Sequence, residues 1–251
     1  MVTDRKAKSL DNFVSAEVVD SELSRGDIAR QSLIEAGVKV FGSHSLSSAS
    51  TRQIAKQAGQ NIASIAYYFG GKQGLYQAVV EHIVSILDSR IGPLLDEISS
   101  YLATNKADPD RCLEYMGQLL ASTLSTHTDM LPVTNIIIKE QMEPTQAFTI
   151  LYNGVLGQLQ TTGSALLEVY CGLPANSEEA IVHFHALLGQ SLIFRFARQT
   201  IICRAGWISI GPHQEQLIQD IVIEQTKAVM RNLRRQHLRK PFIVNRQPCN
   251  I

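Results

Sequence analysis

Residues Ser50–Phe69 read STRQIAKQAGQNIASIAYYF, and this stretch decides the fold. Ser50, followed three residues later by Gln53, has the form of a capping box, so a short helix is predicted to begin there. Gly59 stands where the chain must turn, because glycine takes a positive φ at little cost. Asn61 is then expected to cap a second helix. The stretch therefore predicts two short helices joined by a tight turn.

The apolar residues of this stretch recur at helical spacing. In the first helix they are Ile54, Ala55 and Ala58, and the small side chain of Ala55 lets two helices cross closely. The second helix returns three residues to the core at i, i+3 and i+4: Ile65, Tyr68 and Phe69. Two helices that cross in this way form a helix-turn-helix, which can lay its second helix in a DNA major groove.

Charge is unevenly distributed along a chain whose net charge is zero. No Asp or Glu occurs from residue 36 to residue 80, whereas residues 81–230 carry 16 acidic and 8 basic residues. The bases of the acid-free segment are Lys39, Arg52, Lys56 and Lys72. An acid-free module joined to an acidic body is typical of a protein that contacts phosphate at one end only.

Composition excludes several classes of protein. No run of 18 uncharged apolar residues occurs, and the first 25 residues contain no apolar signal region, so we expect a cytoplasmic protein without a membrane span. The four cysteines form no C-x-x-C pair, so neither a disulfide nor a metal site is expected. Glycine-rich phosphate loops, H-E-x-x-H and G-x-S-x-G are all missing from the sequence. We therefore expect no cofactor and no enzymatic activity.

The chain divides into four predicted parts. Residues 1–23 form a polar mobile arm, residues 24–72 the helix-turn-helix domain, residues 73–238 a helical domain for ligand binding and dimerisation, and residues 239–251 a basic tail. We favour an arm without function over one whose basic residues contact DNA, although both interpretations are open.

The fold class is all-α, with a three-helix head and a body of five or six helices, because no segment alternates as a strand would. Gly92-Pro93 is predicted to kink or end the helix that Lys72 begins, and Pro144 to lie in the first turn of a long helix. The helices are expected at about residues 25–42, 50–58, 61–69, 72–90, 93–104, 109–127, 132–143, 144–172, 177–204 and 212–236.

At the helix-turn-helix the chain resembles the TetR family of bacterial transcription regulators. The resemblance rests on an apolar helix ending in VF, then TRQIAKQAGQNIASIAYYFGGK, then LYQAVVEHI, and covers about residues 25–85. KEQMEPTQAF at 139–148 and HALLGQSLIFRFARQTIICRAGW at 185–207 resemble the C-terminal domain of a TetR subgroup typified by CecR. The resemblance implies a homodimer that binds a palindromic operator in double-stranded DNA, usually as a repressor that a small-molecule effector releases.

The resemblance also implies roles for single residues of the head. Backbone phosphate would be met by Ser50, Thr51, Arg52 and Lys72, and the groove-facing set would be Ile62, Ala63, Ser64, Ala66, Tyr67 and Tyr68. Three positions depart from the family pattern: Ser45, Gln60 and Ala66. The groove-facing set is unusually apolar, so base reading would depend on Ser64, Asn61, Arg52 and DNA shape. For Tyr68 a place in the core is favoured over DNA contact.

In the body, the two long helices expected at 177–204 and 212–236 are predicted to pair with the same two helices of a second subunit and form a four-helix bundle across a two-fold axis. Its interface would bury Leu187, Leu188, Leu192, Phe196, Leu217, Ile221 and Met230, unless these residues pack only within the subunit. Polar residues on apolar helices are the candidates for ligand binding: Asn135, Gln141, Tyr152, His183, Gln190 and Arg195. Arg195 and Arg198 share a helix face that could suit an anion, or could form an interfacial ion pair.

Two functions remain open. The first is a ligand-responsive dimeric repressor. The second is a helical binding or adaptor protein that retains the head fold without regulated, sequence-specific DNA binding. The apolar groove-facing set is the reason to keep the second.

Overall fold

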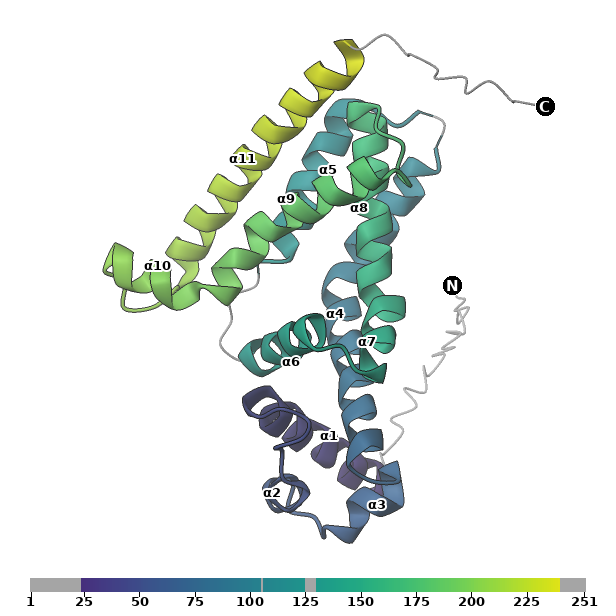
Figure 1. The fold of residues 1–251 in the computed structure, drawn as a ribbon, viewed down its shortest axis with the longest axis vertical. Coiled ribbons are helices and arrows are strands. Elements are labelled where there is room, and N and C mark those ends of the chain that lie inside the picture. The colour runs from purple at the N-terminus through teal and green to yellow at the C-terminus, as the bar shows by residue number, and fades with distance from the viewer. Residues whose placement is uncertain (1–23, 105, 125–129, 240–251) are drawn as a thin grey trace, which may run out of the picture.

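The computed structural model describes residues 24–104, 106–124 and 130–239, and the regular secondary structure within these ranges is helical (Figure 1). The all-α prediction is therefore confirmed. The arm at 1–23 and the tail at 239–251 fall outside the described residues, apart from Arg239, where the last helix ends. A three-helix head lies at one end of the elongated molecule and a helical body at the other.

The head consists of α1 (Arg25–Ser43), α2 (Thr51–Gln57) and α3 (Ala63–Phe69). α1 begins at a complete capping box, in which Ser24 Oγ accepts a hydrogen bond from the Asp27 amide at 3.1 Å. Its buried residues include Leu33, Gly37, Val40 and Phe41. The ranges of all three helices agree with the prediction to within about two residues.

The helix that leaves the head, α4 (Lys72–Leu102), is 31 residues long and runs through Pro93. The expectation that Gly92-Pro93 separates two helices is wrong in this respect. Proline removes one helical hydrogen bond. On both sides of Pro93, however, α4 buries apolar side chains, Ile91, Leu95 and Ile98, in the body core, and this packing holds the helix together.

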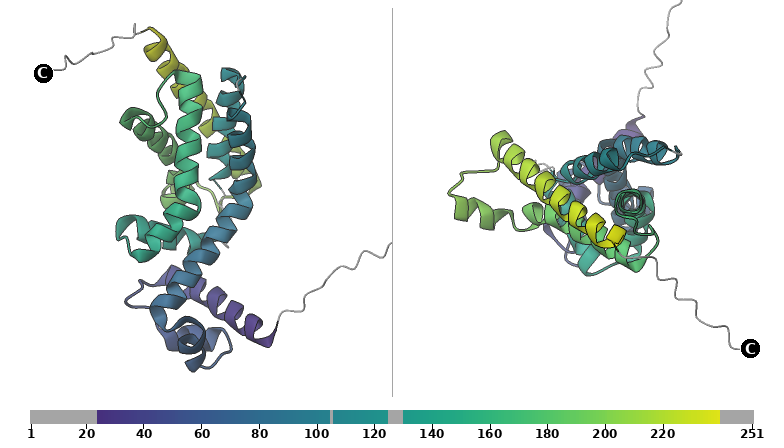
Figure 2. Two further views of the ribbon diagram at one scale, coloured as in Figure 1. Left: turned by 90° about the vertical axis from the view of Figure 1, so that its right-hand side faces the viewer. Right: turned by 90° about the horizontal axis from the view of Figure 1, so that it is seen from above.

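The body adds α5 (Pro109–Ser122), α6 (Leu131–Met142), α7 (Gln146–Leu151), the π-helical segment η2 (Tyr152–Leu156), α8 (Gly157–Cys171), α9 (Glu178–Phe196), α10 (Arg198–Ala205) and α11 (Pro212–Arg239). Figure 2 shows α11 packed along the outside of the body. The segment predicted from Pro144 begins instead at α7, which Thr145 caps by accepting from the Ala147 amide.

The predicted helix 177–204 is broken in two. Ser177 caps α9, but the chain leaves the helical region at Ala197, where φ is −105° and ψ is 30°. α9 and α10 meet at 66°. Beyond the bend, Ile201, Ile202 and Trp207 pack against the body core. No single described helix is long and apolar enough to cross a membrane, although the bent pair α9 and α10 meets those criteria together.

Two hydrophobic cores stabilise the molecule, and the first extends across both predicted domains. The head core joins α1, α2, α3 and the first half of α4 to Val133 and Ile136 of α6 and to Ala147 and Leu151 of α7. The body core joins the second half of α4 to α5, α8, α9 and α11. Helices of the body therefore help to bury the head.

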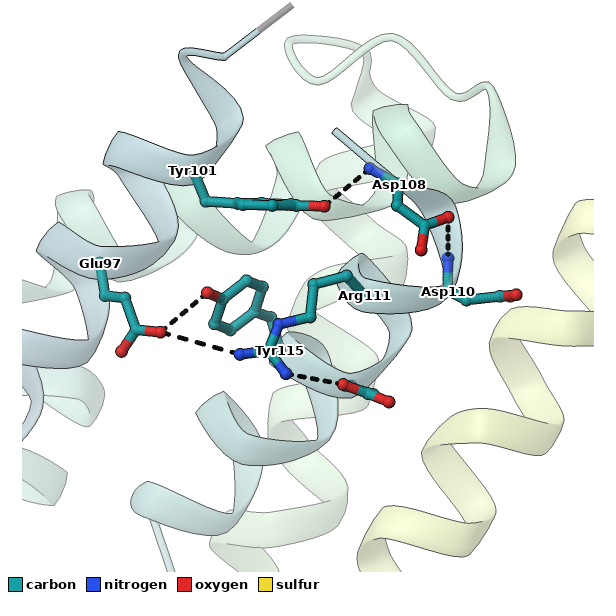
Figure 3. A network of polar contacts seen from close by, with 7 residues as sticks. Glu97, Tyr101, Asp108, Asp110, Arg111 and Tyr115 are labelled. Atoms are coloured by element: carbon teal, nitrogen blue, oxygen red, sulfur yellow. Dashed lines mark hydrogen bonds and ion pairs between the residues drawn. The ribbon is translucent and has the colours of Figure 1, made fainter. Parts of the chain in front are cut away.

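A polar network fixes the corner between α4 and α5 (Figure 3). Tyr115 donates to Glu97 Oε1 at 2.8 Å, and Tyr101 OH accepts from the Asp108 amide at 2.8 Å. Arg111 lies over the Tyr115 ring at 4.5 Å and contacts Glu97 at 3.9 Å. These contacts link the two helices to each other.

Candidate nucleic-acid interface and body cavity

The turn between α2 and α3 has the geometry that its sequence predicts. At the start of α2, Ser50 Oγ accepts from the Gln53 amide at 3.3 Å, which is one of the two hydrogen bonds of the predicted capping box. In the turn itself, Gly59 has a φ of 65°. Asn61 Oδ1 accepts from the Ala63 amide at 2.9 Å. The cap residue proper of α3 is Ile62, so Asn61 satisfies the helix terminus from one residue further out than predicted.

The outer face of α3 is exposed and largely apolar. Tyr67 is 82% exposed and Ile62 is 48% exposed. Ala63 and Ala66 are exposed beside them, and Ser64 is half-buried. Five of the six residues predicted to face the groove therefore share this surface. The sixth, Tyr68, packs against the head core.

Tyr68 belongs mainly to the head. It is half-buried, packs against the head core, and its ring makes edge contacts with Tyr67 at 4.9 Å and with Phe69 at 6.3 Å. Arg30 of α1 lies over the Phe69 ring at 5.4 Å. This arrangement agrees with a packing role for Tyr68, and it leaves Tyr67 as the aromatic residue that reaches outwards.

The residues predicted to contact phosphate flank this face. Arg52 is exposed, and Thr51 is half-buried at the start of α2. Lys72 is half-buried, and its Nζ donates to the Ser47 carbonyl at 2.9 Å. Lys72 therefore holds the loop before α2 as well as placing a positive charge beside α3.

Two of the departures from the family pattern have local structural roles. Ser45 Oγ contacts the hydroxyls of Ser47 and Ser48 at 3.0 and 2.8 Å, so the serine-rich loop is held by its own side chains. Gln60 Nε2 donates to Ser32 Oγ of α1 at 3.4 Å.

The body encloses a cavity of about 430 Å³. Its walls come from α4, α5, α6, η2, α8 and α9, and they are mostly apolar. The polar residues that line it are Arg90, Ser122, Thr123, Thr134, Gln141, Gln160, His185 and Arg195. A cavity of this size and character accommodates a small organic molecule.

Only two of the predicted ligand residues line the cavity, Gln141 and Arg195. The other four do not. Asn135 donates to the Gly42 carbonyl of α1 at 3.2 Å, and His183 lies near Glu179 at 3.9 Å. Tyr152 is half exposed beside Phe148, and Gln190 lies on a different side of α9 from the cavity-lining residues.

Four further polar residues line the cavity and are not predicted from the sequence: Arg90, Thr123, Gln160 and His185. Each comes from a different helix. A polar residue in one helix carries no mark of which neighbouring helix it will face. The 3.6-residue periodicity places His185 opposite His183 on α9, but it does not say which of the two faces inwards.

One helix, α6, contacts the cavity and the head on opposite faces. Thr134, Ile138 and Gln141 line the cavity. On the other face, Lys139 Nζ donates to the carbonyls of Phe41, Gly42 and His44 at 2.8, 3.1 and 2.8 Å and so caps the end of α1. Burial lowers the pKa of Lys139.

Backbone packing at this junction is close. A methyl group at Gly42 would lie 2.6 Å from Pro132 Cα of α6 and 2.9 Å from its carbonyl oxygen. The junction between α1 and α6, formed by Gly42, Pro132, Asn135 and Lys139, is therefore a tight joint between head and body.

The residues predicted for dimerisation separate into two groups. Leu187, Leu188 and Met230 are buried in the subunit's own body core, and Leu192 is half-buried against it. This is the intrasubunit packing considered above as the alternative. Phe196, Leu217 and Ile221 are 50%, 43% and 39% exposed. Further exposed apolar residues of α9 and α11 are Ile181, Val182, Ile193 and Val229.

Comparison with known proteins gives two family matches. Residues 33–79 match "Bacterial regulatory proteins, tetR family", and residues 112–233 match the C-terminal domain of "HTH-type transcriptional dual regulator CecR". The CecR protein of Shigella flexneri is 31% identical over 216 residues, covering 85% of this chain and 96% of its own. The probable regulator YttP of Bacillus subtilis is 32% identical over 111 residues, which cover 44% of this chain and 49% of its own.

Solved structures share the fold. A transcriptional regulator from Rhodococcus sp. Rha1 aligns with a TM-score of 0.52 at 17% identity, over 80% of this chain and 96% of its own. HlyIIR, a hemolysin II transcriptional regulator, aligns with a TM-score of 0.50 at 17% identity, over 81% of this chain and 97% of its own. At these identities the alignments establish the architecture alone.

Proposed function

Because the chain belongs to the TetR family of bacterial transcription regulators, with a C-terminal domain of the CecR type, we propose that it is a homodimeric repressor, which a small-molecule effector releases from a palindromic operator. The observation that carries the DNA-binding part is the exposed face of α3 in a head with no acidic residue from 36 to 80. Such a protein acts on DNA in the bacterial cytoplasm.

Phosphate contacts position the head on the duplex. The donors come from the N-terminus of α2 with Ser50, Thr51 and Arg52, from the phenol of Tyr67, and from Lys72, which follows α3 in the chain. Hydroxyl, guanidinium and ammonium groups suit phosphate oxygens, and such contacts set register without reading sequence.

Base reading falls to Asn61, Ser64 and the apolar part of the face. Ile62, Ala63 and Ala66 suit the methyl group of thymine, and none of them can make the paired hydrogen bonds that distinguish guanine. We therefore expect an operator rich in A·T pairs, with part of the specificity from DNA shape.

The exposed apolar residues of α9 and α11 form the proposed dimer surface. Phe196, Leu217 and Ile221 remain from the sequence-based set, and Ile181, Val182 and Val229 extend it. Leu187, Leu188 and Met230 would support this surface from beneath, since the subunit core already buries them. Two such surfaces related by a two-fold axis would present two α3 helices to two half-sites.

α6 is the proposed route from the cavity to the head. A molecule that displaces Thr134 or Gln141 would move the helix whose other face caps α1 through Lys139. Because Gly42 of α1 packs closely against Pro132 of α6, a small shift of α6 would turn the head relative to the body.

The test is binding of the full-length protein to the DNA upstream of its own gene, at several salt concentrations. We expect sequence-selective binding that weakens steeply with salt, and a loss of about tenfold in Arg52→Ala. Arg204→Ala, an exposed arginine of α10, is the control and should bind as the wild type does. If no duplex competes better than random DNA, the adaptor function replaces this one.

A reporter gene placed behind the bound DNA distinguishes the sign of regulation. Repression predicts higher expression when the gene for this protein is deleted. The Shigella flexneri relative is named a dual regulator, so lower expression on deletion would show activation at that promoter.

A further inference from the structure

The polar residues of the body cavity have a one-sided charge. Among the described residues that line it, the charged ones are Arg90 and Arg195, and no Asp or Glu is present. The rest of the wall is apolar or neutral. Its apolar residues include Leu87 and Ile91, near Arg90 in the sequence, and Phe196, next to Arg195. Arg90 is exposed, so the charge that the cavity itself must accommodate is that of Arg195, and burying a charge is costly.

Arg195 is the more enclosed of the two arginines. Within the described part of the chain, its guanidinium donates to neutral oxygens, the Thr123 carbonyl of α5 at 3.3 Å and the Thr134 hydroxyl of α6. Burial, and after it the positive charge of Arg90, lower the pKa of Arg195. The guanidinium carries five N–H donors, so two acceptors leave it with donors to offer.

We propose that the cavity binds an apolar organic anion, whose carboxylate or sulfonate pairs with Arg195 while its hydrocarbon part fills the apolar walls. The proposal rests on the effector-dependent function proposed above and names the chemical class of that effector. A guanidinium suits such a group because two parallel N–H donors match two anionic oxygens. The volume of about 430 Å³ suits a molecule of one or two rings or a short chain.

A second polar group in the wall adds a requirement. Gln160 Oε1 is buried and has no hydrogen-bond partner among the described residues, whereas its Nε2 contacts His185 Nδ1 at 2.8 Å. A buried acceptor left without a donor costs free energy. An anion that also carries a hydroxyl or amide N–H would satisfy Gln160 and bind more tightly than one without.

The position of Arg195 also gives the anion a route to the head. In this structure the guanidinium holds Thr134, which lies on the cavity face of α6. An anionic group competes with Thr134 for the same donors because a charged acceptor makes the stronger hydrogen bond. Release of Thr134 would free α6, whose opposite face caps α1 through Lys139.

The test is calorimetric titration of the full-length protein, without DNA, with matched pairs of probes. The acids are biphenyl-4-carboxylate, naphthalene-2-sulfonate and octanoate, and each is compared with its neutral amide. We expect at least one acid to bind about tenfold more tightly than its amide, and Arg195→Gln to remove that preference while amide binding remains. Arg204→Gln, an exposed arginine outside the cavity, should keep the preference.

The proposal is overturned if no acid binds better than its amide, or if the preference survives in Arg195→Gln. The comparison of acid with amide in the wild type stands even if that variant does not fold. Arg195→Lys provides a second variant, which retains the positive charge but lacks the two parallel N–H donors of the guanidinium. It should show a reduced preference for the acid over the amide. Because no DNA is present, failure here is separate from failure to bind an operator.

Discussion

The DNA-facing surface and the body cavity are assembled in different ways. The surface comes from one continuous stretch, Ser50–Lys72, whose side chains project outwards from two short helices. The cavity draws its walls from six helical segments spread over Leu87–Phe196. A site built from neighbours in sequence can change with little effect on the fold, whereas a site built from many helices changes whenever their packing does.

The two regions meet at the junction of α1 and α6, so damage there should harm both. Gly42→Ala places a methyl group 2.6 Å from backbone and ring atoms of Pro132, which cannot move aside as a flexible side chain would. We expect a loss of about 3 kcal/mol in the free energy of unfolding, measured by urea denaturation.

Gly26→Ala in the same helix is the matched control. Its added methyl group would meet Ser24 Oγ and Tyr68 OH at 3.5 and 3.6 Å, which are ordinary contacts. If the two variants are equally stable, head and body are not joined as tightly as the structure indicates.

A second experiment asks how far the head depends on the body. Tyr76 of α4 donates to Glu140 Oε1 of α6 at 2.7 Å, and Glu140 is 1% exposed. Burial, and then this hydrogen bond, raise the pKa of Tyr76, so the phenol keeps its proton. We expect Tyr76→Phe to cost about 2 kcal/mol in urea denaturation, because a buried carboxylate loses a donor.

Thr145 still donates to Glu140 in that variant, so the effect should be limited. Tyr152→Phe, at a half-exposed tyrosine, is the control and should change stability little. A loss no larger than that of Tyr152→Phe would show that the hydrogen bond between Tyr76 and Glu140 contributes little to the link between α4 and α6.

Lys72 tests the exposed side of the comparison. Lys72→Ala removes a charge beside α3 and the bond to the Ser47 carbonyl. We expect DNA binding to weaken about tenfold, uniformly across sequences, with a salt slope reduced by about one. Lys106→Ala, an exposed lysine of the body, is the control. A change in sequence preference instead of a uniform loss would assign Lys72 to base reading.

Thiol reactivity gives the smallest and most local test. Cys112 and Cys171 are buried, and burial raises the pKa of each to about 11, whereas Cys203 is exposed. In a Cys249→Ser background at pH 8, only Cys203 should react quickly with Ellman's reagent, because the buried thiols are neither ionised nor accessible. Fast reaction of Cys112 would show that the body core opens to solvent.

Much of the head could be predicted from its sequence because it is formed by residues that are neighbours in the chain, whereas the cavity is formed by residues far apart. Caps and turn glycines act within a few residues, so Ser50 and Gly59 lie where local rules expect them, and Asn61 differs from its predicted cap position by a single residue. The course of α4 through Pro93 and the bend at Ala197 depend on packing against distant helices, and no local pattern announces either.

The cavity shows the same limit more sharply. Arg195 was identifiable as a charged residue on an apolar helix. Arg90 and Gln160 were not, because only the folded arrangement brings them to the same enclosure. Asn135 and His183 had the same polar character in sequence and face elsewhere.

The π-helical segment η2 has an evolutionary consequence. Its Gly157 amide bonds to the Tyr152 carbonyl, five residues back, so the segment holds one residue more than an α-helix would need. A single-codon deletion there would leave α7 and α8 in phase and withdraw Val155 or Leu156 from the cavity wall. A change of one residue in length at this point would therefore alter the cavity wall without altering the exposed face of α3.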